Sequence, residues 1–262
     1  MKETLSRTRE WVTTRSGQTQ STGFTAADAA VAKALNDVYS SAVVMEPRDH
    51  EKRYAAFLAR KPEDRVFVGK FDDVLEFLRA VRGAGAGRRG VTAEEMPNLN
   101  RDALPLINLS RGFDITYDNN DQEIDRKKYG TITDPAQADK PLAEVETTQA
   151  SLNYTITLIA ADNDTLSLMC NTLAANFRSR LTTNFTAPEI LVRWPVELNC
   201  SIQDAKTIMF SDISPPFSQQ RIYACQASMI VMVDVLTAYE VNARSVRYDT
   251  QLAAPGGNAD GR

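Results

Sequence analysis

Three closely spaced aspartates, Asp114, Asp118 and Asp121, are the side chains in this sequence best placed to do chemistry. Carboxylates of this kind can hold Mg²⁺, so a metal-dependent nuclease is one function to weigh. The acidic run at 118–125 also suggests calcium, but an EF-hand loop requires glycine at its sixth position, where this chain has Glu123. We therefore interpret the run as a solvated loop between strands.

Other catalytic motifs fail on residue type or on context. His50 is the single histidine and stands among charged residues, so we interpret it as a solvated residue at a helix start; a histidine-based triad has no second candidate, and a His-rich zinc site cannot form. The Gly-rich segment 83–90 follows a predicted helix, where a phosphate-binding loop would follow a strand, and no Gly-Lys-Ser/Thr motif follows it. We predict a linker there. The sequence thus predicts a protein that is not an enzyme and has no cofactor and no metal.

Composition narrows the class of protein further. The formal net charge is −4, so no global basic field draws the chain to nucleic acid. The three cysteines are widely spaced and lack CxxC pairs, which predicts reduced core residues. No apolar run is long enough for a membrane helix, and the N-terminal residues lack an apolar signal segment, so we expect no membrane association.

The first third of the chain predicts an arm followed by helices. Residues 1–24 are polar and without periodicity, which predicts a flexible N-terminal arm with Trp11 as an anchor for a partner. Helices are expected at 26–39 (with Thr25 as N-cap), 51–60 and 71–81, and a short strand at 65–68. The Gly-rich linker ends this helical region, so residues 25–90 form one unit and a boundary falls at 90.

The rest of the chain has the period of strands. Strands are expected at 104–117, 152–160, 190–202 (a strand pair or one bent strand) and 221–241, with a polar loop at 118–141. A helix beginning at 163 or 164 and reaching Phe177 lies between the second and third strands. The pattern predicts an α+β fold over 91–245, mainly an antiparallel curved sheet with a helix packed on one face. Residues 246–262 are predicted to be a disordered tail.

Four segments between 104 and 241 form a recognisable order: Leu104-Pro-Leu-Ile-Asn-Leu109; Phe113–Tyr117; Tyr154–Ile159 leading into the helix that ends near Phe177; and Arg221–Tyr223, which opens a long strand. This layout resembles the tail terminators (tail sheath stabilisers) of T4-like contractile-tailed bacteriophages, whose first strand has the pattern LPxINL. The aromatic near the end of the last strand is Tyr239, where the family has Trp, and the helical region 25–82 has no counterpart.

The resemblance implies a homo-hexameric ring in the virion tail or neck. Such a ring caps the tail tube and sheath, contacts the neck and head-completion proteins, and lets DNA pass through its lumen without specific binding; we expect an acidic lumen. The alternative is another virion ring, namely a head-completion, tube or baseplate protein. The expected interface residues are Trp11, Leu106, Asn108, Asp118, Asp121, Arg221, Gln226 and Asp234, on the predicted arm, the first and last strands and the acidic loop.

Overall fold

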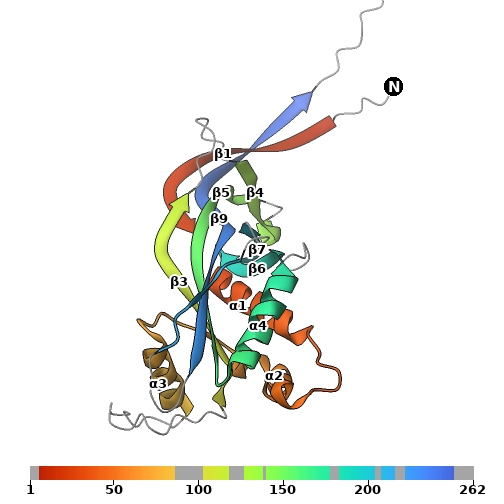
Figure 1. Cartoon of the computed structure of the whole chain (residues 1–262). Helices are drawn as coiled ribbons and strands as arrows, with labels where there is room; N and C mark the ends of the chain where they lie inside the picture. Colours follow the sequence, from red (N-terminus) through yellow and green to blue (C-terminus); the bar gives the residue numbers. More distant parts are fainter. Residues whose placement is uncertain are drawn as a thin grey trace, which may run out of the picture.

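Two long antiparallel strands form the spine of the sheet in this computed structural model (Figure 1). The structure describes residues 6–85, 103–117, 127–137, 140–177, 183–203, 208–215 and 222–250. The strands are β1 (Ser6–Ser21), β2 (Val66–Val68), β3 (Leu106–Tyr117), β4 (Lys127–Asp134), β5 (Lys140–Ala160), β6 (Asn184–Leu191), β7 (Trp194–Gln203), β8 (Phe210–Asp212) and β9 (Tyr223–Thr250). Within the described residues the helices are α1 (Thr25–Ser40), α2 (Lys52–Leu58), α3 (Val74–Gly85) and α4 (Asn163–Phe177), and single-turn 3₁₀ helices lie at Asp49–Glu51, Pro62–Asp64 and Pro135–Gln137.

The spine pairs β5 with β9 without a register shift, from Ala143 opposite Glu240 to Ala160 opposite Tyr223. Along the outer edge of β5 lie β3 and then β4, and along the outer edge of β9 lie β8, β7 and β1. The order through the body is β2-β3-β5-β9-β7-β6, mostly antiparallel and strongly curled. The predicted α+β class with a curved, mainly antiparallel sheet is confirmed.

Helices cover both faces of the sheet, which corrects the prediction of a helix on one face only. Helices α1, α2 and α4 contribute to one apolar cluster with Ile156, Leu158 and Val231. Helix α3 packs on the opposite face, in a second cluster that includes Ile159 and Ala224. Side chains alternate between the two faces of a strand, so neighbours such as Leu158 and Ile159 enter different clusters.

The helical region is not a separate unit before a boundary at residue 90. Strand β2 pairs in parallel with β3, and α1 shares the main apolar cluster with the sheet. Helix α3 continues through Gly83 to Gly85, and residues 86–90 of the predicted linker lie outside the described residues. Helix α1 begins at Thr25 itself, and its N-cap, Phe24, makes no side-chain cap. The predicted cap is therefore wrong by one residue.

Strands extend into segments that we predicted to be arm, loop and tail. Residues 6–21 of the predicted flexible arm form β1. The predicted polar loop contains β4, and β5 starts at Lys140, well before the expected strand at 152. Strand β9 continues to Thr250, into the predicted tail, whose remaining residues lie outside the described part of the chain. Long-range pairing with β5 and β9 explains these strands better than their own weak periodicity.

Strands β6, β7 and β9 agree in part with what the sequence predicted. The strand pair expected at 190–202 is β6 and β7, joined by Val192 and Arg193 with φ of 50° and 69°. In β9 the predicted buried face, alternate residues from Cys225 to Val235, is confirmed. Beyond that point Leu236 and Ala238 belong to the main apolar cluster, so the core lies there on the other face of the curled strand, and Val241 is buried as well.

Candidate assembly surface

A two-stranded arm, defined here as Ser6–Arg15 of β1 and Val241–Thr250 of β9, is the feature best suited to assembly. These residues form ten consecutive pairs, whereas β5 accompanies β9 only as far as Glu240. At about 3.3 Å per residue the arm extends roughly 30 Å past β5. It leaves the body at the end away from α2 and α3 (Figure 1). Among the described residues β9 pairs beyond Glu240 with β1 alone, and a two-stranded ribbon by itself is at best marginally stable in water, which favours a partner surface for the arm.

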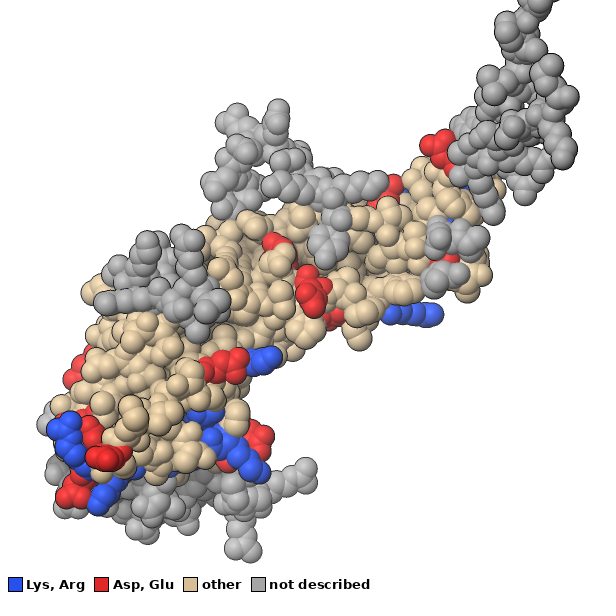
Figure 2. Space-filling model, turned by 90° about the vertical axis from the view of Figure 1, so that its right-hand side faces the viewer, with Lys and Arg blue, Asp and Glu red and all other residues tan. Residues whose placement is uncertain are grey.

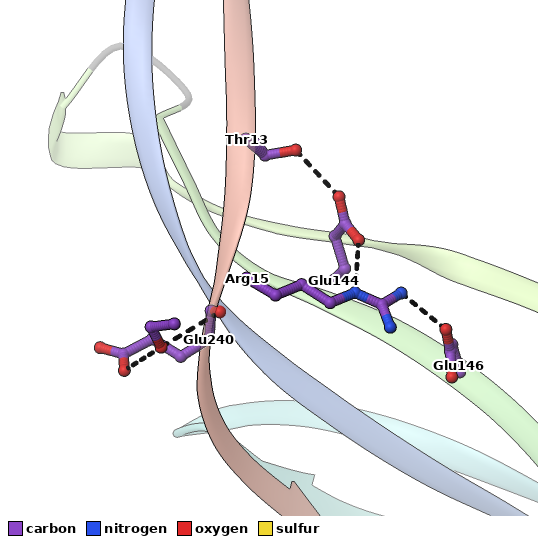
Figure 3. A network of polar contacts seen from close by, with 6 residues as sticks. Thr13, Arg15, Glu144, Glu146 and Glu240 are labelled. Atoms are coloured by element: carbon purple, nitrogen blue, oxygen red, sulfur yellow. Dashed lines mark hydrogen bonds and ion pairs between the residues drawn. The ribbon is translucent and has the colours of Figure 1, made fainter.

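Arg15 ties the base of the arm to β5 across the intervening strand β9 (Figure 3). Its Nη2 donates to Glu146 Oε1 at 2.6 Å and its Nε to Glu144 Oε2 at 3.2 Å. Thr13 Oγ1 donates to the other Glu144 oxygen at 2.9 Å, and the guanidinium lies 4.3 Å from the ring centroid of Tyr239. Hydrogen bonds to Glu146 and then to Glu144 raise the pKa of Arg15. The network orients the arm relative to the spine.

A bulge follows directly and contains Gly17. Between Arg15 and Thr19, β1 has three residues while β9 has only Glu240. Gly17 has φ of +90°, which L residues rarely adopt, and Ser16 Oγ donates to Glu240 Oε2 at 2.8 Å. A bulge bends its strand and increases the local twist. The bend therefore lies where the arm meets the body.

The free strand edges differ in how readily they can pair with another chain. Strand β6 ends the sheet and contains Pro188, which has no N–H to donate. Strand β3 has a bulge between Arg111 and Ile115. Beside it, Lys70 Nζ lies 4.4 Å from the ring centroid of Phe113. Prolines and bulges hinder pairing at an edge. The arm has neither within its ten regular pairs, so its edges are the more open ones.

One face of the sheet carries mostly uncharged polar side chains; we call it the open face. Beyond the end that α3 covers, no helix of the described residues packs on it. Register and alternation place on it Ser110 of β3, Gln149, Ser151, Asn153 and Thr155 of β5, Asn184 and Thr186 of β6, Glu197, Asn199 and Ser201 of β7, and Gln226, Ser228, Ile230 and Asp234 of β9. Glu197 and Asp234 are the charged side chains among these.

Asp234 is held by hydrogen bonds across three strands. Asn199 Nδ2 donates to its Oδ2 at 2.7 Å and Gln149 Nε2 to its Oδ1 at 3.3 Å. The three side chains line a pocket of about 310 Å³. Charged side chains of both signs gather instead at the end of the molecule away from the arm, on the side seen in Figure 2. Ion pairs there include Lys52–Asp49 and Arg53–Asp162.

The structure separates the eight predicted interface residues. Leu106 is 3% exposed and packs under α3, and Asn108 beside it is also buried, so neither lies on a free surface of the chain. The sequence did not reveal that α3 covers this end of the sheet. Trp11 is half-buried on the arm, opposite Ser245. Gln226 and Asp234 lie on the open face. Asp118, Asp121 and Arg221 lie outside the described residues.

Sequence reasoning missed Arg15, Glu144 and Glu146 because it missed the strand that brings them together. The available signal was the run Trp11–Thr14 together with two further threonines in residues 6–21, residue types that favour strands. The register that sets Arg15 near two glutamates far along the chain has no local signal.

The residues that the sequence offered for chemistry lie apart or outside the described part of the chain. No group of three or more His, Cys, Asp or Glu side chains among the described residues could hold a metal ion. Asp114 is exposed on β3, while the two aspartates expected to join it are outside the described residues. His50 is exposed in the 3₁₀ turn before α2, and its Nε2 lies 3.8 Å from Glu51 Oε1. No described helix is long and apolar enough to cross a bilayer. Neither a protein-family model nor a curated protein matches this chain.

Proposed function

We propose that this chain is a structural virion protein, the tail terminator of a contractile-tailed phage, which assembles as a homo-hexameric ring. In this role it caps the tail tube and sheath and joins the tail to the neck and head-completion proteins. The resemblance of segments within 104–241 to that family motivates the identity. The arm supports assembly, because over its ten residue pairs the described residues give β9 no strand partner besides β1, and contact with another copy best accounts for such a ribbon.

Ring formation requires contacts between different surfaces of neighbouring copies, repeated until the ring closes. The arm supplies one such surface, since it leaves the body along a direction set by Arg15 and the bulge at Gly17. Its edges are free of proline and bulges, whereas Pro188 and the β3 bulge hinder the edges of the body. We expect each arm to pack on the body of the next copy in the ring, with backbone pairing as the main contact.

The open face is our candidate for the lumen wall. DNA passing through a ring is held back mainly by cationic side chains that contact phosphates. The open-face side chains named above include no Lys or Arg and two acids, Glu197 and Asp234, so a wall made of them lets DNA slide. The expected acidic lumen stays a prediction, with a weakly acidic wall.

The direct test is the solution mass of the full-length protein by light scattering behind size exclusion, followed by imaging of any oligomer. We expect six copies of the 29.0 kDa chain and a ring with a central opening. The variant Val12→Glu, at an arm residue that is 49% exposed, should prevent assembly by placing a charge in the contact. Val43→Glu, at a body residue that is 79% exposed, is the matched control and should assemble normally.

Binding to purified tail tubes separates the remaining outcomes. A protein that is monomeric alone but forms rings on tube ends, with Val12→Glu defective and Val43→Glu normal, supports the proposal. Rings found only at the head side of the neck or in the baseplate would assign the chain to another virion ring. A chain that stays monomeric with tail tubes present, or a Val12→Glu variant that assembles like wild type, would contradict the role of the arm.

A further inference from the structure

Two cysteines from separate elements lie in direct contact. Cys170 Sγ of α4 is 3.2 Å from Cys225 Sγ of β9, and neither is in a disulfide. The sequence predicted three unrelated core cysteines, and only the packing of α4 on the spine brings these two together. The third, Cys200, lies buried on β7.

We propose that Cys170 and Cys225 are a dithiol site that forms a reversible intramolecular disulfide when the protein meets a small-molecule disulfide. A disulfide has an S–S distance of about 2.05 Å, so the two sulfurs must approach by roughly 1.2 Å. Small rotations about the two Cα–Cβ bonds supply such a movement, so α4 and β9 need not separate. The proposal does not depend on ring assembly.

The two thiols are unequal, which sets the order of reaction. Cys170 is partly exposed, whereas Cys225 is 6% exposed. The hydrogen bond between the sulfurs lowers the pKa of Cys170, while that bond and burial raise the pKa of Cys225. Because the thiolate is the attacking species, the accessible Cys170 reacts first and Cys225 resolves.

The exchange is balanced in two steps. The Cys170 thiolate attacks one sulfur of the small-molecule disulfide, forms a mixed disulfide and releases one thiolate. That thiolate takes the proton of Cys225, whose thiolate then attacks Cys170 Sγ and expels the second small thiolate, which takes up from solvent the proton that Cys170 released on ionising. The protein loses two electrons and two thiol protons in total, and the oxidant is reduced to two thiols.

The bond would join α4 to the spine around a long loop. The residues lie 55 positions apart, and the segment between them contains β6, β7 and β8. Closing a loop of this length restricts the unfolded chain. We expect the oxidised protein to melt about 5–15 °C above the reduced one.

The test treats the full-length protein, at low concentration, with glutathione disulfide and counts free thiols after denaturation without reductant. We expect the count to fall from three to one, with the Cys170 and Cys225 peptides linked within one chain and dithiothreitol restoring all three. Cys200→Ser is the matched control. It should form the same bond and show the same rise in Tm, because burial raises the pKa of the Cys200 thiol to about 12 and leaves it unreactive.

Cys170→Ser and Cys225→Ser should each abolish the intramolecular bond and the rise in Tm. Cys170→Ser is the safer variant because that side chain is only partly buried. Three free thiols in the folded wild type after prolonged oxidation would overturn the proposal. So would linked peptides that include Cys200, or bonds found only between chains.

Discussion

Replacing Gly17 with alanine probes whether the bulge at the base of the arm is held by backbone conformation alone. A Cβ added at Gly17 would meet no atom within 4 Å, so the substitution introduces no clash. The φ of +90° is the remaining obstacle, because a side chain at that angle approaches its own backbone.

The expected cost is about 1–2 kcal/mol, the penalty for an L residue in the left-handed region. This cost destabilises β1 specifically. Strand β1 can open without unfolding the spine, because β5 and β9 pair independently of β1. Opening of β1 should therefore become about 5–30-fold more frequent. Gly23→Ala is the matched control, since a Cβ there also meets nothing within 4 Å and its φ is not in the positive range. It should leave β1 unchanged or slightly stabilise the protein.

Hydrogen exchange followed by mass spectrometry measures this opening directly. Amides of Val12–Thr14 should exchange faster in Gly17→Ala by the same 5–30-fold, which corresponds to about 1–2 kcal/mol, while amides of the spine around Ile156 should not change. Equal exchange in Gly17→Ala and Gly23→Ala would refute the conformational argument. Faster exchange throughout the spine would also refute it, because it would mean that β1 unfolds only with the whole domain.

Three further substitutions test the core and its polar contacts by urea unfolding. Tyr154→Phe removes the hydrogen bond that Tyr154 Oη donates to Asp28 Oδ1 at 2.7 Å, and we expect a loss of about 1.5–3 kcal/mol because the acceptor is charged. Leu158→Ala, at a side chain with no exposure, should cost about 2–5 kcal/mol. Burial raises the pKa of Asp162, but hydrogen bonds from Thr165 and Arg53 outweigh it and leave the pKa lowered. Its ionised carboxylate thus stabilises the fold at pH values above the ordinary Asp pKa. The Asp162→Asn variant should therefore show its whole loss in free energy of unfolding at pH 7, and this loss should shrink as the pH falls below about 4.

Local patterning was enough to predict the elements with strong periodicity. The alternation in residues 152–160 placed one face of β5 in the core, and the stripe through Leu166 and Phe177 predicted α4 over nearly its full length. Alternation also predicted the buried face of β9 up to Val235. Each pattern reflects how a single helix or strand packs on a single surface. In that situation the burial of apolar side chains determines the conformation.

The weakly patterned strands required their partners. Residues 6–21 are polar, and β1 forms because β9 offers backbone groups for pairing along its length. The same holds for β4, which pairs with the first part of β5. Where the strands curl, the core moves to the other face at Leu236, so a strict period of two no longer predicts burial.

The sequence by itself determined the α+β class, the helix on the spine and the strand alternation, because these depend on neighbours a few residues apart. Only the tertiary structure determined which side chains meet at the base of the arm and at the cysteine pair. It brought Arg15 to Glu144 and Glu146, and Cys170 to Cys225. These contacts join residues far apart in the chain, and their geometry follows from register, curl and helix packing summed over the whole sheet. No single segment of the sequence contains that information.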